Sequence, residues 1–174
     1  MSEDSVGGGP SGSAGKKRST VDPQLAEVLD EPQPKRRRHP ADTLHSAVRA
    51  DDDRQIERAL SEGASIDSTA AVEAEDGFPA IYSGCTITAL MLAVGLGRNR
   101  IARLLLERGA DVHARVGFGA TAVYIGAEIG NVEMIVALAA AGGDINAADD
   151  EGFTPVCVAA QNGNAETVRV LVEL

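Results

Sequence analysis

The sequence has 174 residues, a formal net charge of −10 and no tryptophan, so its length allows one ordinary domain with a tail. No stretch is apolar over a membrane-spanning length, and the first residues, MSEDSVGGGP, lack the basic-then-apolar order of a secretory signal. Residues 41–174 hold nine Arg, no Lys and twenty Asp or Glu, and such an acidic body repels phosphate backbones.

The first 40 residues are rich in Gly, Ser and Pro, and their apolar residues are few and scattered. Because such a segment buries too little apolar surface to offset its ordering entropy, we expect residues 1–40 to form a disordered tail. Its basic runs resemble the two halves of a nuclear-import signal: Lys16, Lys17 and Arg18, then Lys35, Arg36, Arg37 and Arg38. A solvated tail and a nucleic-acid contact are the alternatives, although the segment has no aromatics for base stacking.

The rest of the sequence repeats itself. Threonines and glycines recur every 33 residues: Thr88, Thr121 and Thr154, then Gly97, Gly130 and Gly163. The same pattern begins at Asp42, but its spacing to the next unit is 46 residues, which places 13 extra residues between Asp67 and Thr88. Several markers in one register indicate a repeat architecture.

Each unit is predicted to form two short antiparallel helices. In the unit that starts at Thr88, Leu90, Ala93 and Val94 have i, i+3, i+4 spacing and share one face of the first helix. The second helix ends at Gly109, a residue type favoured just past a helix end. A hairpin then leads to the next unit. One helix pair cannot bury its apolar face alone, so neighbouring units must stack.

This pattern resembles the ankyrin repeat over roughly residues 41–174. The segments that carry the resemblance are Thr154-Pro155-Val156-Cys157-Val158-Ala159-Ala160, Gly109-Ala110-Asp111 and Gly142-Gly143-Asp144-Ile145-Asn146. The resemblance implies an all-α solenoid of helix-turn-helix units joined by β-hairpins. Only His45 keeps the family's histidine, and Met91, Tyr124 and Cys157 replace it, so we expect a weaker tie between helix and turn. The family's proline is also absent at Ala122.

These markers divide the chain into six segments. They are a disordered tail at 1–40, a degenerate repeat 1 at 41–67, an insertion at 68–83, repeat 2 at 84–115, repeat 3 at 116–148 and a truncated repeat 4 at 149–174. By this register the next glycine falls at position 175, so we expect the array to continue beyond Leu174; the alternative is that a partner covers the apolar face of the last helix.

The family binds proteins through its inner helical faces and hairpin tips, which implies a set of contact residues here. The inner-face candidates are Leu92, Ile125 and Val158, the hairpin candidates are Phe118, Asp149, Asp150, Glu151 and Phe153, and the insertion adds Phe78 and Tyr82. Exposed aromatics are frequent interface anchors, and the acidic tip suits a basic partner. Packing within the repeat stack is the alternative interpretation for the apolar residues.

No motif indicates catalysis, a cofactor or a metal. The segment Gly117-Phe118-Gly119-Ala120-Thr121-Ala122 fits a dinucleotide fingerprint, but Gly119 aligns with Gly152 of the next unit, so the hairpin explains it. The three histidines lack metal-ligand spacing, Asp51-Asp52-Asp53 suits a helix start, and Cys85 and Cys157 indicate reduced intracellular thiols. The arginines of residues 84–115 form a basic stripe between acidic neighbours.

The sequence therefore predicts a non-catalytic protein–protein interaction module, a scaffold or adaptor that acts in the nucleus or alternatively in the cytoplasm. Its expected partners are proteins and an import receptor for the basic run, without a membrane, a cofactor or a small-molecule ligand. One alternative is the regulatory region of a longer enzyme such as a kinase or an E3 ubiquitin ligase. Another is a nucleic-acid-associated protein that uses the tail and the arginine stripe.

Overall fold

The computed structural model describes residues 40–72, 77, 78 and 80–174. Both basic runs and the rest of the expected tail lie outside the described residues, except for Pro40, which begins α2. In the described part the helices are α2 (Pro40–Ala50), α3 (Asp53–Ser61), α4 (Ala89–Gly95), α5 (Asn99–Glu107), α6 (Ala122–Glu128), α7 (Val132–Ala140), α8 (Pro155–Gln161) and α9 (Ala165–Glu173). The strands are β1 (Thr69–Ala71) and β2 (Thr86–Thr88), and the short 3₁₀ helix is η1 (Ala80–Tyr82).

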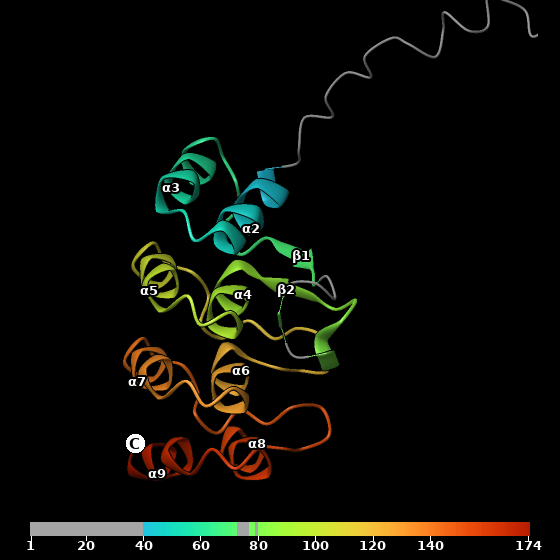
Figure 1. The fold of residues 1–174 in the computed structure, drawn as a ribbon, viewed down its shortest axis with the longest axis vertical. Helices are drawn as coiled ribbons and strands as arrows, with labels where there is room; N and C mark the ends of the chain where they lie inside the picture. Colours follow the sequence, from blue (N-terminus) through green and yellow to red (C-terminus); the bar gives the residue numbers. More distant parts are fainter. Residues whose placement is uncertain (1–39, 73–76, 79) are drawn as a thin grey trace, which may run out of the picture. The chain divides into compact units, whose positions relative to one another are not determined.

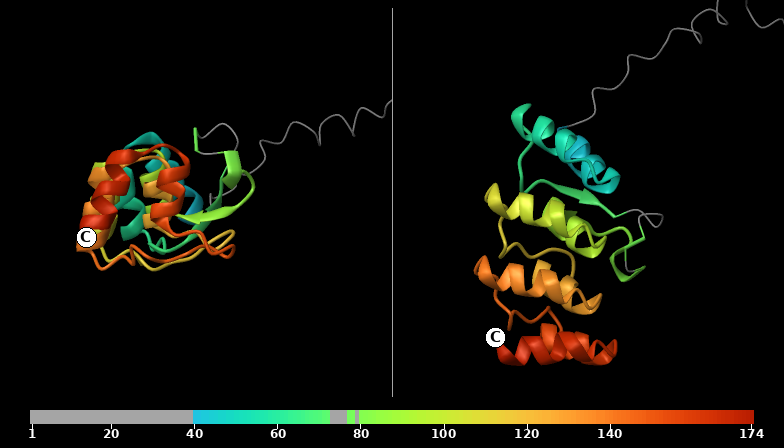
Figure 2. Two further views of the ribbon diagram at one scale, coloured as in Figure 1. Left: turned by 90° about the horizontal axis from the view of Figure 1, so that it is seen from below. Right: turned by 60° about the vertical axis from the view of Figure 1, so that its left-hand side comes forward.

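The helices form antiparallel pairs that stack in a single column (Figure 1). The first helices of the pairs, α2, α4, α6 and α8, lie in one layer, and the second helices, α3, α5, α7 and α9, lie in another (Figure 2). The predicted all-α solenoid is therefore confirmed. The helix pair α2–α3 occupies the residues assigned to repeat 1, and the segment boundaries themselves stay a prediction.

The threonines that recur every 33 residues stand at the starts of first helices. Thr88 and Thr121 adopt extended backbone, and their hydroxyl oxygens accept hydrogen bonds from the amides of Met91 (3.3 Å) and Tyr124 (3.2 Å). Each cap satisfies one of the amides that a helix start leaves unpaired. Thr154 instead donates to Cys157 Sγ at 3.2 Å, and Pro155 presets the first helical turn.

A left-handed residue ends each first helix and turns the chain toward the second. Gly97 has φ 67°, a conformation that costs glycine nothing. Asp51 occupies the equivalent place in the α2–α3 pair with φ 57°, where an L side chain is strained. The turn between the two helices of a unit therefore requires a left-handed residue. Glycine supplies it in the later units, and Asp51 supplies it in the first.

The core lies between the two helical layers. Every residue from Ala89 to Val94 in α4 and from Ala122 to Ala127 in α6 is buried. The second helices bury one face only, as in α5, where Ile101, Ala102 and Leu105 point inward. The first helices are thus enclosed on more sides than the second helices.

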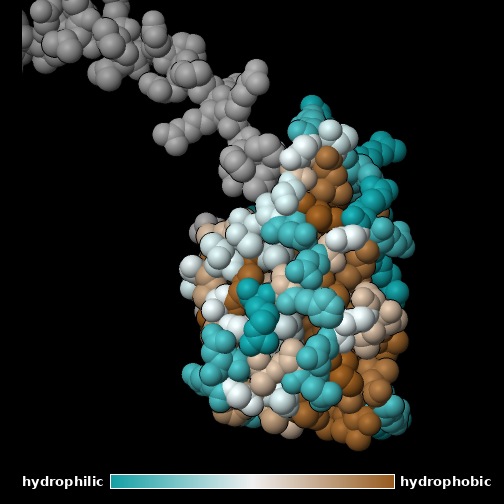
Figure 3. All heavy atoms as spheres, turned by 180° about the vertical axis from the view of Figure 1, so that it is seen from behind, coloured by the Kyte–Doolittle hydropathy of each residue, from teal (hydrophilic) through white to brown (hydrophobic). Residues whose placement is uncertain are grey.

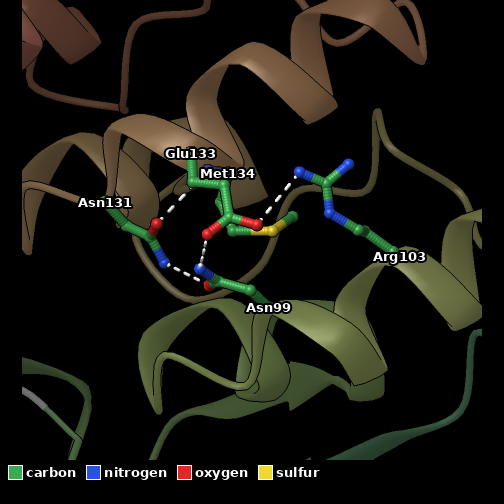
Figure 4. Close-up of polar contacts among 5 residues, drawn as sticks. All are labelled: Asn99, Arg103, Asn131, Glu133 and Met134. Carbon is green, nitrogen blue, oxygen red and sulfur yellow. Dashed lines mark hydrogen bonds and ion pairs between the residues drawn. The ribbon is translucent and has the colours of Figure 1, made fainter.

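Polar side chains also tie neighbouring units together, as between α5 and α7 (Figure 4). Asn99 donates to Glu133 Oε2 at 2.6 Å, and Arg103 pairs with Glu133 Oε1 at 3.0 Å. Asn131 donates to Asn99 Oδ1 at 2.7 Å while its own Oδ1 caps α7 by accepting from the Met134 amide at 3.2 Å. The start of α7 is therefore bonded to α5 of the unit before it.

The insertion between α3 and α4 extends a connecting hairpin. Its arms are β1 and β2, which pair antiparallel with Thr69 opposite Thr88 and Ala71 opposite Thr86. The buried His45 ring makes a 3.1 Å hydrogen bond through Nε2 to the Ile87 carbonyl, so it ties α2 to β2. The insertion lies on the side of the first helices that faces away from the second helices (Figure 2, left).

Candidate protein-binding site

The insertion is anchored by a row of four aromatic rings. Phe78 contacts Tyr82 edge-to-face with ring centroids 5.1 Å apart, Tyr82 contacts Phe118 at 5.2 Å, and Phe118 contacts Tyr124 at 6.1 Å. These rings come from the insertion, the hairpin before α6, and α6 itself. Aromatic pairs with this geometry add stability beyond their buried area. The row fixes the insertion against the third helix pair.

Two tyrosine hydroxyls in this row bind carboxylates. Tyr82 donates to Glu128 Oε2 at 2.7 Å, and Tyr124 donates to Asp149 Oδ2 at 2.9 Å. Burial and then the carboxylate bond raise the pKa of both tyrosines well above their ordinary value. Burial also raises the pKa of Glu128, although the bond from Tyr82 works in the opposite direction.

Asp149 organises the tip of the hairpin before α8. Its Oδ1 accepts from the amides of Glu151 (3.0 Å) and Phe153 (2.8 Å), which closes a tight turn. Burial alone would raise the pKa of Asp149, but these amides and the Tyr124 hydroxyl hold it below its ordinary value. The amide of Asp150 donates to the Phe118 carbonyl at 2.9 Å, so the two neighbouring hairpins are joined. The tip is therefore a rigid support for the side chains around it.

A groove of about 460 Å³ opens between the insertion, the two hairpin tips, α6 and α8. We call it the acidic groove, and its lining residues are Ile81, Phe118, Tyr124, Glu128, Asp149, Glu151, Phe153, Val158, Gln161 and Asn162. The lining contains three carboxylates and no Lys or Arg. Its exposed apolar side chains are Ile81, which is 62% exposed, and Phe153, which is 38% exposed. The groove thus combines negative charge with accessible apolar surface.

The acidic groove brings together five of the ten predicted contact residues. These are Phe118, Asp149, Glu151, Phe153 and Val158. Asp150 is exposed beside the groove and pairs with Arg115 at 3.8 Å, so its charge is matched within the chain. The roles of these residues in binding stay a prediction, but the structure places them around one groove, where Val158 is 7% and Asp149 is 8% exposed.

The other four predicted contact residues are buried, so the expectation that they offer surface to a partner is wrong. Tyr82, Leu92 and Ile125 have no exposed surface, and Phe78 is 9% exposed. The physical reason is the enclosure of α4 and α6 by a second helix on one side and the insertion on another. Their apolar side chains pack within the stack, which was the alternative interpretation.

A comparison of equivalent positions shows what covers the start of each first helix. Met91 in α4 is buried, Tyr124 in α6 is buried, and Cys157 in α8 is exposed. Phe78 packs on α4 at Gly95, and Tyr82 bonds Glu128 at the end of α6. Within the described residues no insertion side chain is recorded against α8. This position is covered by the hairpin of the following unit: His45 in α2 bonds the Ile87 carbonyl and Tyr124 bonds Asp149, whereas no described hairpin follows Cys157.

Sequence reasoning missed part of the acidic groove. The missed lining residues are Ile81, Tyr124, Glu128, Gln161 and Asn162. The replacement of the family's histidine by Tyr124 was a signal, because a buried phenol needs an acceptor, which Asp149 supplies. Ile81 gave no comparable signal, since the repeat register does not determine how an insertion folds.

The arginine stripe of residues 84–115 is paired with the neighbouring units. The pairs are Arg98 with Asp51, Arg100 with Asp53, Arg108 with Glu57, Arg103 with Glu133 and Arg115 with Asp150. Such exposed pairs contribute little stability each. They nevertheless match the stripe's positive charge, so a phosphate backbone would have to compete with five carboxylates for it.

Apolar side chains also gather over α7 and α9, at the lower right of Figure 3. On these helices Val136 is 47% exposed and Val172 is 75% exposed. Among the residues that the structure describes, no three His, Cys, Asp or Glu side chains converge in a way that could hold a metal ion. No helix in the described part is long and apolar enough to cross a membrane.

Comparison with known proteins agrees with the architecture. Residues 90–174 match the family model described as ankyrin repeats in three copies. The match begins within α4 and ends with α9, so it includes both hairpin tips and most of the acidic groove. No curated protein matches the chain.

Proposed function

We propose that the chain, whose residues 90–174 match a family model of ankyrin repeats, is a non-catalytic module that binds a protein partner through the acidic groove. The observation that carries the proposal is the convergence of two hairpin tips, α6, α8 and the insertion on one open groove. Exposed Ile81 and Phe153 offer apolar contact area, and exposed aromatic residues are frequent anchors at interfaces.

The chemistry of the acidic groove supports recognition over catalysis. Asp149 is fully engaged by the Tyr124 hydroxyl and two backbone amides, so it supports the hairpin tip. Glu128 is bonded to Tyr82, whose raised pKa keeps its proton near neutral pH. A general acid or base needs a pKa near the working pH and a proton to exchange with substrate. These two carboxylates instead hold structure in place.

A cell-based experiment tests the proposal. The tagged full chain would be expressed in its own cells beside the variant Ile81→Ser/Phe153→Ala and the control Val136→Ser, and neighbouring proteins would be labelled by proximity. Val136 is an exposed apolar residue on α7 outside the groove, so the control also removes one exposed side chain. We expect a set of labelled proteins that the control keeps and the groove variant loses. Identical sets from all three chains, with unchanged circular dichroism, would contradict the proposal.

We also propose a nuclear site of action, supported by the basic run Lys35–Arg38 in the sequence. This run lies outside the described residues, so the support is the sequence pattern alone. A chain with Lys35–Arg38 replaced by alanine should label cytoplasmic proteins where the natural chain labels nuclear ones. Cytoplasmic labelling by both chains would make the run a solvated tail and remove the nuclear part of the proposal.

A further inference from the structure

From the chemistry of the acidic groove we infer that its occupant is a short partner segment that presents an arginine beside an apolar side chain. This inference rests on the proposed function and adds to it the class of partner. It follows from three properties of the groove: uncompensated carboxylates, an exposed aromatic ring, and an apolar wall supplied by the insertion.

The uncompensated carboxylates are Glu128 and Glu151. Within the described residues, the side-chain carboxylate of Glu128 accepts one hydrogen bond, from Tyr82 to Oε2, and forms no ion pair. Glu151 is exposed and forms no ion pair with a described residue. Asp150, close by, is already paired with Arg115, and Asp149 has both oxygens occupied. Two negative charges in a groove without Lys or Arg are complementary to a cation from a partner.

The exposed ring favours arginine over lysine as that cation. Phe153 is 38% exposed at the rim, beside Glu151 in the same hairpin tip. A guanidinium is planar and weakly hydrated, so it can stack on a ring while it donates to a carboxylate. A lysine ammonium is strongly hydrated and loses more on entering a partly apolar groove. Ring and carboxylate together therefore fit one guanidinium.

The apolar neighbour of the arginine is expected to contact Ile81. Ile81 is 62% exposed although it is held by the anchored insertion, and Val158 of α8, which is 7% exposed, lines the same groove. A groove of about 460 Å³ lies within the range that encloses a few side chains. The occupant is therefore a short segment whose side chains enter the groove.

The test is a selection from a random-peptide phage library on the full chain, with Glu151→Gln as a parallel target. Glu107→Gln is the matched control, because it removes one exposed carboxylate on α5. Peptides enriched on the natural chain and on the control should carry arginine next to an apolar residue. They should not be enriched on Glu151→Gln.

Binding constants of an enriched peptide give the quantitative readout. Both tyrosines of the chain lie in the row of rings beside the groove, so tyrosine fluorescence reports binding there. Replacing the peptide arginine by alanine, or Glu128 by glutamine, should weaken binding about tenfold or more, the usual effect of losing a charge-assisted bond. Glutamine can still accept from Tyr82, so the insertion stays anchored. Replacing the peptide arginine by lysine should also weaken binding.

The outcomes separate this inference from the proposed function. Enriched peptides that lack a cation but lose binding to Ile81→Ser/Phe153→Ala would overturn the inference and leave the groove as a binding site. Arginine peptides that bind Glu128→Gln and Glu151→Gln as tightly as the natural chain would also overturn it. A library that yields no binder would overturn both.

Discussion

Replacing Gly95 by alanine should destabilise the fold, although the same change in an open helix position is stabilising. Gly95 ends α4, and a Cβ there would lie 2.6 Å from Phe78 Cδ2 and closer still to Cε2 and Cζ. Replacing glycine by alanine at a compatible helical position stabilises the fold by about 0.4–1 kcal/mol, because alanine lowers the conformational entropy of the unfolded chain. The ring must leave its site to admit the new methyl group, because the space is filled.

The size of the effect follows from what Phe78 loses. Truncating a buried phenylalanine costs about 3–5 kcal/mol, and Phe78 is 9% exposed at the edge of the core, so we take about 3 kcal/mol for Phe78→Ala. Displacement of the ring by Gly95→Ala should then cost about 2 kcal/mol net of the helix gain. In the Phe78→Ala background the same substitution should stabilise the fold by about 0.4–1 kcal/mol.

The assay is urea unfolding of the four chains of this double-mutant cycle, followed by far-ultraviolet circular dichroism. Tyrosine fluorescence adds a local readout, since Tyr82 contacts Phe78 and the chain has two tyrosines. A reversal of sign between the two backgrounds is the expected result. If Gly95→Ala stabilised the natural chain, Phe78 would not be seated on α4 and the anchored insertion would be refuted.

Three further predictions concern stability and ionisation. Ala122→Pro should stabilise the fold by about 0.4–1 kcal/mol, because Thr121 before it is already extended and Pro155 occupies the equivalent helix start. A lower melting temperature would contradict the repeat alignment. Asp51→Gly should add about 0.5 kcal/mol by relieving a left-handed residue, and a lower urea midpoint would contradict the strain. The folded chain should show little tyrosinate absorbance at about pH 11, since burial raises the pKa of both tyrosines above the ordinary value of 10.0. The unfolded chain loses its tyrosine protons near pH 10, so the contribution of the two tyrosines to the free energy of unfolding is complete below pH 10 and falls as the pH rises above it. Tyrosinate absorbance at about pH 11 in a chain that is still folded would refute the burial of the two rings.

The repeat architecture can be predicted from the sequence because each unit repeats the same short-range pattern of residues. Thr88 and Thr121 recur at helix starts, and the structure shows their hydroxyls capping α4 and α6. Gly97 recurs at the turn, and its φ of 67° is the physical reason for glycine there. Each such constraint involves neighbours within one unit, so a single sequence displays it without knowledge of the tertiary structure.

The insertion could not be placed from the sequence, because its position depends on contacts far along the chain. Tyr82 bonds Glu128, 46 residues away, and packs on Phe118. The repeat register holds no information on segments that depart from it. The sequence therefore marked Phe78 and Tyr82 as unusual aromatics, but it assigned them to the surface when they form the anchor.

The insertion also determines where in the repeat stack a partner can bind. In a regular array each first helix offers similar surface, yet here Phe78 of the insertion packs on α4 and Tyr82 of the insertion bonds Glu128 at the end of α6. The same insertion that removes surface from α4 and α6 supplies Ile81 as a wall of the acidic groove. A partner that binds in the groove therefore contacts both the repeat and a segment outside it. Specificity of this kind cannot be transferred from other ankyrin repeats, because Ile81 and the anchored Tyr82 belong to the insertion and not to the repeat pattern.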